Sequence, residues 1–227
     1  MLKFSYPNKV YYKMQFDSVD ILRDSSMNRM GSRILKRSFD FVFSLVFLCT
    51  LFPVILVIVI IVTECTMPGN PFFVQKRTGL KGRIFSCYKF RTMRKNEDSD
   101  SLQATKDDCR TTRWGHILRM TNIDETPQFI NVLLGDMSVV GPRPHMVKHT
   151  EEFSRIIDGF MVRHTVKPGI TGWSQMNGLR GEIRSLIDMR LRVKYDIWYI
   201  RHWSFYLDLY IIVKTFFKCF GNDSNAY

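Results

Sequence analysis

Residues 41–62 read FVFSLVFLCTLFPVILVIVIIV, an apolar stretch of twenty-two residues without a charged side chain. A helix of this length is long enough to cross the hydrocarbon core of a bilayer. A signal peptide is the alternative, but this stretch starts about forty residues into the chain, exceeds the usual apolar region of such a peptide, and is followed by Thr63-Glu64-Cys65. We therefore expect a membrane segment that stays in the mature protein.

A proline and two basic flanks set the expected path of this segment. Pro53 follows twelve residues of the stretch and precedes nine, and a proline inside a helix removes a hydrogen bond and bends the chain. Each arm would reach about 14–18 Å, roughly one leaflet. Residues 21–40 and 63–83 are both basic, which favours the cytoplasmic side for both. We predict a re-entrant helix-turn-helix with its bend at Pro53, while a straight span with a tolerated proline fits the physics equally well.

The composition indicates an anionic partner without identifying it. The formal net charge is +12, which suits nucleic acid, acidic lipid headgroups or phosphorylated substrates alike. With 45% hydrophobic residues in 227, the chain can bury a core and is not of the disordered class. The five cysteines include no CxxC pair, so we expect reduced thiols in a cytoplasm-facing protein rather than a zinc site or a disulfide framework.

The chain divides into four expected segments: an extension over residues 1–32, the membrane hairpin over 33–64, a cytoplasmic catalytic domain over 65–220, and a tail over 221–227.

Within the third segment, turn formers at residues 68–71 precede FFVQKR and RIFSCYKF, which flank GLKG at 79–82 and predict a β-hairpin. The polar run 94–113 predicts a long loop that either covers a site or is a solvated insertion. We expect helices over residues 145–165 and 183–200.

The last long apolar run suggests a second contact with lipid. Residues 203–220 read WSFYLDLYIIVKTFFKCF and carry aromatic side chains on most sides, which suits a helix at a membrane interface, with a buried core helix as the alternative. The expected fold class is therefore α+β and mostly helical. It combines a re-entrant membrane helix-turn-helix with a small cytoplasmic domain that contains a β-hairpin and amphipathic interfacial helices.

Two adjacent acids carry the chemical hypothesis. Residues 124–134, DETPQFINVLL, predict a helix with Asp124 as its N-cap and Gly135 as its stop. Acids at a helix start usually serve only as caps. Here, however, Arg119 lies five residues before Asp124, and Gly141-Pro142-Arg143-Pro144 follows the helix. Cations that converge on a helix N-terminus suit a phosphate, and carboxylates serve as covalent nucleophiles in phosphoryl transfer.

Several long motifs in a fixed order give the chain a specific resemblance. They are LKRSFDF, PFFVQKRTGLKGRIFSCYKFRTM, LRMTNIDETPQFINVLLGDMSVVGPRP, KPGITGW and YDIWYIRHWSFYLDL. Over about residues 33–218 the chain resembles the monotopic phosphoglycosyl transferase family, bacterial enzymes that initiate capsule, exopolysaccharide and other glycan assembly. Larger relatives carry further membrane helices and another domain before this region, which we expect to be absent here. Phe52 stands where relatives often have a small polar residue before the proline.

The resemblance implies a two-step reaction. Asp124 would attack the β-phosphate of a UDP-sugar, release UMP and hold the sugar 1-phosphate as an ester, from which undecaprenyl phosphate takes it. Glu125 would assist as a ligand of Mg²⁺ or as a base, and these two roles stay open. Asp196 in YDIWY matches another acidic position and is a second candidate metal ligand.

Further residues are implied in binding. Lys89, Arg91, Arg119 and Arg143 would bind substrate phosphates, and Pro142 and Pro144 would form a rigid turn near the nucleotide. Some of these residues have a structural alternative. Lys89 and Arg91 could be exposed strand residues, and Arg143 could serve only to order the turn. Asp196 could be an acid on the surface of a helix.

The resemblance also places the protein at the bacterial inner membrane, with the catalytic domain facing the cytoplasm and membrane lipids as partners. We expect no nucleic-acid partner, and a homo-oligomer stays open. The run NGLRGEIRSLIDMRLRVKYDIWYI resembles the branch that transfers glucose or galactose 1-phosphate. A non-catalytic basic scaffold of a glycan assembly complex, anchored in the membrane, is the alternative function.

Overall fold

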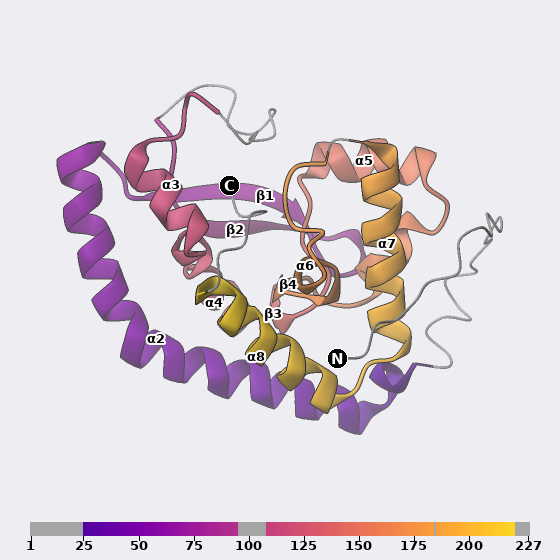
Figure 1. Cartoon of the computed structure of the whole chain (residues 1–227). Coiled ribbons are helices and arrows are strands. Elements are labelled where there is room, and N and C mark those ends of the chain that lie inside the picture. The colour runs from indigo at the N-terminus through magenta and orange to yellow at the C-terminus, as the bar shows by residue number, and fades with distance from the viewer. Residues whose placement is uncertain (1–24, 95–107, 184, 221–227) are drawn as a thin grey trace.

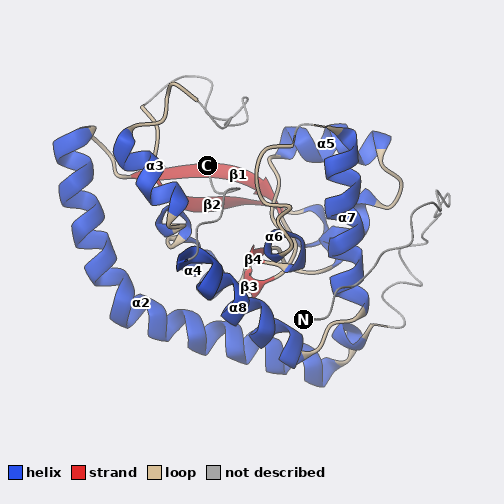
Figure 2. Ribbon diagram, in the orientation of Figure 1, coloured by secondary structure: helices blue, strands red, loops and turns tan. Residues whose placement is uncertain are grey.

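The computed structural model describes residues 25–94, 108–183 and 185–220 (Figure 1). It is mostly helical, with one long apolar helix and two small sheets (Figure 2), so the predicted α+β class is confirmed. Most of the predicted extension, the centre of the predicted loop over 94–113, and the predicted tail lie outside the described residues.

Helix α2, Met30–Thr66, contains the apolar stretch and is long and apolar enough to cross a membrane. The predicted turn at Pro53 is wrong, because α2 continues through that residue as one helix. A helix accommodates a proline by losing one hydrogen bond and bending. Figure 1 shows that α2 changes direction along its course without a break.

One face of α2 packs against the rest of the protein along most of its length. The buried residues of α2 recur at intervals of four, seven or eight, as expected of one helix face. They are Asp40, Ser44, Phe52, Val59 and Thr63. The opposite face exposes large apolar side chains, among them Val42, Val46, Leu51, Val54, Ile58 and Ile61.

The predicted hairpin is confirmed. Strands β1, Phe72–Thr78, and β2, Ile84–Phe90, pair antiparallel with Phe72 opposite Phe90 and Thr78 opposite Ile84. The turn between them contains the short 3₁₀ helix η2, Leu80–Gly82, in which Lys81 has a φ of 54° and Gly82 a φ of 76°. Glycine adopts such left-handed angles readily, which explains Gly82 at this tight turn.

The acidic motif forms two short helices rather than one. After α3, Arg113–Met120, the chain forms η3, Ile123–Glu125, and then α4, Gln128–Leu134, which ends at Gly135 with a φ of 92°. The predicted stop at Gly135 is therefore confirmed, but Asp124 is not an N-cap. It lies inside η3, and Pro127 occupies the cap position of α4. The proline starts α4 because its fixed φ suits the first turn of a helix.

A parallel pair of very short strands holds the next part of the chain. Strand β3, Ser138–Val140, pairs with β4, Gly169–Thr171. A Cβ atom on Gly169 would lie 2.1 Å from the backbone nitrogen of Gly141, so glycine is required for this close approach. Between the strands lie α5, Val147–Ile156, and η4, Phe160–Thr165, which together account for the predicted helical stretch over 145–165.

The C-terminal elements are α6, Trp173–Met176, then α7, Leu186–Arg201, and α8, Phe205–Phe220. A buried polar cluster joins α2, α7 and α8, since Asp208 accepts hydrogen bonds from Lys36 at 2.6 Å, Tyr199 at 2.7 Å and Trp203 at 3.0 Å.

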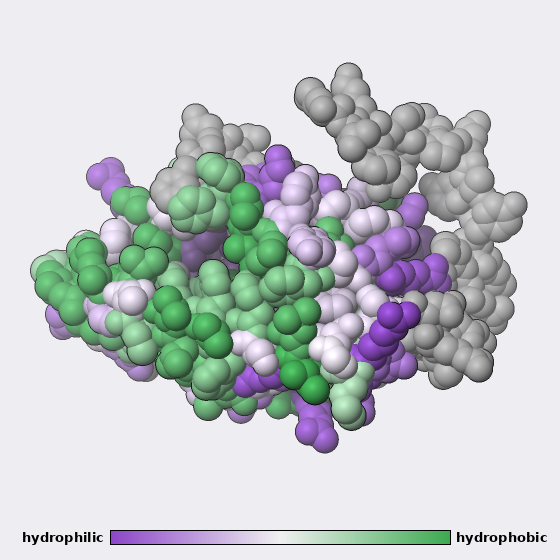
Figure 3. All heavy atoms as spheres, turned by 90° about the horizontal axis from the view of Figure 1, so that it is seen from below, coloured by the Kyte–Doolittle hydropathy of each residue, from purple (hydrophilic) through white to green (hydrophobic). Residues whose placement is uncertain are grey.

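Helix α8 buries one side and exposes the other. Asp208 and Ile211 are buried. The exposed side carries large side chains, which are Tyr206, Tyr210, Val213, Phe216 and Phe217. Figure 3 shows a broad apolar surface on the face of the molecule seen from below.

Candidate active site

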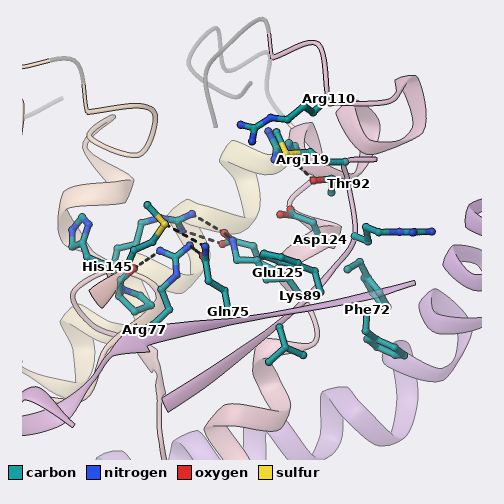
Figure 4. A pocket seen from close by; sticks show the side chains of 18 of the residues that line it. Phe72, Gln75, Arg77, Lys89, Thr92, Arg110, Arg119, Asp124, Glu125 and His145 are labelled. Atoms are coloured by element: carbon teal, nitrogen blue, oxygen red, sulfur yellow. Dashed lines mark hydrogen bonds and ion pairs between the residues drawn. The ribbon is translucent and has the colours of Figure 1, made fainter. Parts of the chain in front are cut away.

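A cavity of about 810 Å³ lies between the hairpin, the α3–η3 segment, residues 143–146 and the chain around Arg180 (Figure 4). Among the described residues that line it, the two acids are Asp124 and Glu125. The basic side chains are far more numerous, namely Arg77, Lys89, Arg91, Arg94, Arg110, Arg119, Arg143, Arg180 and Arg192. Such a strong excess of positive charge in a concave site favours a polyanionic ligand.

Glu125 is bound by three cations. Lys89 Nζ lies 2.8 Å from Oε1, Arg143 contacts both carboxylate oxygens at 2.7 and 3.2 Å, and Arg180 lies 3.0 Å from Oε2. Burial opposes ionisation of this carboxyl, but the three cations outweigh it and hold the pKa of Glu125 well below its usual range. A carboxylate with so low a pKa is a weak base near neutral pH.

Asp124 is in a different state, although it is the adjacent residue. It is 8% exposed, and within the described part of the chain no side chain donates a hydrogen bond to it. Burial raises the pKa of Asp124, and the charge of Glu125 adds to this effect, while Lys89, Arg180 and Arg119 oppose it. Asp124 therefore differs from Glu125, because its carboxyl group lies in a cavity rich in positive charge without a hydrogen bond from a described side chain.

The four predicted phosphate-binding residues contact different partners around the cavity. Lys89 and Arg143 contact Glu125, whereas Arg119 donates from Nε to Thr92 Oγ1 at 2.9 Å and lies near Asp124. Arg91 donates to the carbonyl oxygens of Met67 and Pro68, so its guanidinium fixes the turn that follows α2 at the edge of the cavity.

The Pro142–Pro144 turn is held from both sides. Arg163 donates to the carbonyl of Arg143 at 2.8 Å, and Arg77 donates to that of Pro144 at 3.0 Å. The Pro142 carbonyl accepts from the amide of Gly169 at 2.9 Å. These contacts fix the backbone that positions the Arg143 guanidinium on Glu125. The turn is thus ordered by other residues, and the Arg143 side chain contacts Glu125.

Asp196 is not where the sequence analysis expects a metal ligand. It is 1% exposed, accepts from Ser174 at 2.8 Å, and forms an ion pair of 2.7 Å with Arg163. It does not line the cavity. The structure therefore does not bring Asp196 to the cavity with Glu125, and the buried carboxylate is paired with the guanidinium of Arg163 instead.

The donor atoms left for a divalent metal are few. Within the described ranges, no group of three or more His, Cys, Asp or Glu side chains is placed to hold a metal ion. Mg²⁺ is nevertheless often held by one or two carboxylates together with substrate phosphates. Since Glu125 is occupied by cations, Asp124 is the carboxylate that fits such a substrate-bridged ion.

Two site residues were missed from the sequence. Arg180 belongs to the run NGLRG, in which glycines on both sides of a basic residue indicate a loop, but nothing local indicates that this loop reaches Glu125. His145 follows the proline turn and lines the cavity, and burial together with Arg163 and Arg192 holds its pKa well below the usual value, so it is neutral.

The fold and the site define a protein with one helix that is long and apolar enough to cross a membrane, and with a strongly basic cavity that contains two adjacent carboxyl groups. The family of bacterial sugar transferases matches residues 31–222. The chain therefore belongs to the bacterial sugar transferase family, which confirms the resemblance.

Three relatives share the name UDP-glucose:undecaprenyl-phosphate glucose-1-phosphate transferase. That of Escherichia coli K12 is 47% identical over 194 residues, which is 85% of this chain and 42% of the relative. That of Klebsiella pneumoniae is 48% identical over 204 residues, or 89% of this chain and 43% of the relative. That of Caulobacter vibrioides is 42% identical over 200 residues, or 88% of this chain and 74% of the relative. The chain thus spans less than half of the first two relatives.

Proposed function

We propose that this chain transfers a hexose 1-phosphate from a UDP-sugar to undecaprenyl phosphate and so initiates the synthesis of an exopolysaccharide, capsule or other glycan. The observation that carries the proposal is the difference between two adjacent acids. Asp124 has free oxygens in a cationic cavity, while Glu125 is bound by three cations. Such a pair suits a nucleophile beside a group that organises phosphate-binding side chains.

The reaction consists of two displacements at one phosphorus. An Asp124 carboxylate oxygen attacks the β-phosphorus of the donor, the bond to the bridging oxygen breaks, and UMP leaves with the electron pair. An oxygen of undecaprenyl phosphate then attacks the same phosphorus and displaces the carboxylate. The product is a lipid diphosphate that carries the hexose, and Asp124 is restored.

The cations on Glu125 stabilise the charge that both steps spread over phosphate oxygens. Lys89, Arg143 and Arg180 already converge at 2.7–3.0 Å on one carboxylate, so the protein has positioned them before a substrate enters. Phosphoryl transfer depends mainly on such positioning and electrostatic stabilisation. With its low pKa, Glu125 acts as an anchor for these cations rather than as a base.

In this proposal Asp124 is the residue that would hold Mg²⁺, and the ion would supply positive charge to the donor diphosphate.

The packing of α2 supports the re-entrant topology. Side chains near both ends of the helix contact the same domain, since Arg37 donates to the Val132 carbonyl at 2.6 Å and Thr63 accepts from Trp114 at 3.1 Å. A helix that crossed the bilayer would carry its two ends to opposite sides. We therefore propose that α2 enters and leaves by the cytoplasmic face and bends within the lipid, with its exposed face in contact with acyl chains.

Helix α8 supplies a second membrane contact. Its exposed side chains Tyr206, Phe216 and Phe217 belong to the type that lies at the headgroup level. Lys214 and Lys218, on the same helix, suit anionic lipids. The apolar surface in Figure 3 is thus the face that we place on the bacterial inner membrane.

Glucose is the sugar that the relatives favour. All three relatives described above are named as glucose-1-phosphate transferases, at identities of 42–48%. We propose UDP-glucose as the donor to test first, with UDP-galactose next.

The proposal is tested by UMP release from UDP-glucose in the presence of undecaprenyl phosphate. We expect turnover by the wild type and its loss in Asp124→Asn, which keeps the size of the side chain and removes its nucleophilic charge. Asp158→Asn is the matched control, because Asp158 is exposed and does not line the cavity. Turnover by Asp124→Asn at the wild-type rate would reject the proposal, and no turnover with any UDP-sugar would favour the scaffold.

A further inference from the structure

A second group of cations lies away from the cavity, at the C-terminal end of α4. Arg37 of α2 donates to the carbonyls of Val132 and Leu133 at 2.6 and 2.9 Å, and so covers the end of this helix. A Cβ atom on Gly135 would lie 3.6 Å from Lys167 Nζ and 3.7 Å from Arg37 Nη2, so the two cations lie close to one point that has no side chain of its own. None of these residues lines the cavity.

The charge of Lys167 has no direct partner in the described part of the chain. The side chain is half-buried, and it forms neither a hydrogen bond nor an ion pair with a described residue. Burial lowers the pKa of Lys167 and the charge of Arg37 adds to this effect, while Asp40 and Asp136 oppose it. A half-buried ammonium group beside a guanidinium is stabilised by an anion that reaches both.

These cations lie where α2 changes from basic to apolar. The guanidinium of Arg37 lies 5.9 Å from the ring centre of Phe41, the residue with which the apolar stretch begins. Phe129 of α4 packs against Phe47 of α2 with 4.2 Å between ring centres, so α4 lies along the same apolar stretch. Leu134, the last residue of α4, is 65% exposed. Cations next to exposed apolar side chains on a membrane helix are typical of the level of the lipid headgroups.

We infer that Arg37 and Lys167 bind the phosphate of an anionic lipid headgroup, that of phosphatidylglycerol, while Leu134 and the exposed face of α2 contact its acyl chains. The phosphate supplies the counter-charge that Lys167 lacks, and the missing side chain at Gly135 leaves it room beside both cations. This lipid site is separate from the catalytic cavity. The inference rests on the proposed contact of α2 with lipid and not on the transfer reaction.

The effect of lipid on stability tests this site. The full chain is purified in detergent, and its unfolding temperature is measured with added short-chain phosphatidylglycerol, with phosphatidylcholine of the same chain length, or with inorganic phosphate. We expect phosphatidylglycerol to raise the unfolding temperature of the wild type most, because a ligand that binds only the folded state stabilises it. Lys167→Gln should need about tenfold or more phosphatidylglycerol for the same rise, since one charge-assisted contact is lost.

Two further comparisons separate a lipid site from a structural role. Without lipid, Lys167→Gln should be at least as stable as the wild type, because it removes a charge that burial and Arg37 oppose. Lys148→Gln removes the same charge at an exposed position of α5 and is the matched control, with the lipid response of the wild type.

Three outcomes would overturn the inference. They are an equal lipid response in Lys167→Gln and Lys148→Gln, a loss of stability in Lys167→Gln without lipid, and an equal rise with inorganic phosphate at the same concentration. UMP release by the wild type, measured on the same preparation, tests the proposed function separately, so the two failures are distinguished.

Discussion

Arg163 and Asp196 form an ion pair of 2.7 Å in which both side chains are at most 2% exposed, and Arg163 also donates to the backbone carbonyl of Arg143 at 2.8 Å. Since the guanidinium of Arg143 binds Glu125, a continuous series of contacts runs from Asp196 to the acidic pair. We therefore expect Asp196 to act on the site at a distance, as a positioning residue.

The first prediction follows from this series. Asp196→Asn leaves a buried guanidinium without its counter-charge, which costs about 3–5 kcal/mol in the free energy of unfolding. Replacing both partners, as in Arg163→Met with Asp196→Leu, should restore most of the stability, because a buried pair replaced by apolar groups is often neutral. UMP release should stay low in the double variant, since Arg143 loses its backbone contact. Denaturant unfolding in detergent, with UMP release in parallel, measures both; full activity of the double variant would contradict a positioning role.

The second prediction concerns pH. Asp124 must be ionised to attack, and burial raises its pKa, so activity should be lost on acidification at a pH above the usual aspartate range near ~3.9. Glu125 contributes to the raised pKa, so Glu125→Gln should move this acidic limb to lower pH, even though the rate also falls. The pH profile of kcat/KM for UMP release gives the answer, and a limb that stays in place or moves to higher pH would rule out this account of Asp124.

The third prediction concerns the geometry of a cation. Arg143 contacts both oxygens of Glu125, and lysine cannot reproduce this fork. Arg143→Lys should therefore lower kcat/KM about tenfold or more although the charge is kept. Arg155→Lys, at an exposed position of α5, is the matched control and should match the wild type. Equal activity of the two variants would mean that charge alone is required at position 143.

The fourth prediction concerns topology. Cys65 lies next to the end of α2, and Gly31→Cys places a thiol near its start, where a side chain has open space. In single-cysteine variants, a thiol reagent that cannot cross membranes should label neither position in intact cells and both after permeabilisation. Labelling of one position in intact cells would indicate a span and refute the re-entrant path.

The sequence predicted correctly those elements that are determined by residues close together in the chain. The hairpin followed from turn residues between two apolar strands, and Gly135 as the stop of α4 followed from its tolerance of a positive φ. The sequence also predicted that Asp124 and Glu125 lie among basic residues, because Arg119 and Arg143 are close to them in the chain.

The remaining features depend on contacts between distant segments. Strands β3 and β4 have three residues each, too few for a periodic signal, and exist because Gly141 and Gly169 allow two backbones to touch. Asp196 was assigned to a metal because its partner Arg163 lies on another element, and Arg180 was missed for the same reason. Pro53 predicted a turn, but a proline can be accommodated within a helix, and α2 continues through it.

The covalent adduct tests the central claim most directly. The protein is mixed with UDP-glucose without acceptor, quenched in acid, digested and analysed by mass spectrometry. A hexose phosphate on the peptide that contains Asp124, absent from Asp124→Asn and removed by undecaprenyl phosphate, is the predicted result. An adduct on another side chain, or release of UMP during turnover with no adduct at any time, would contradict the account.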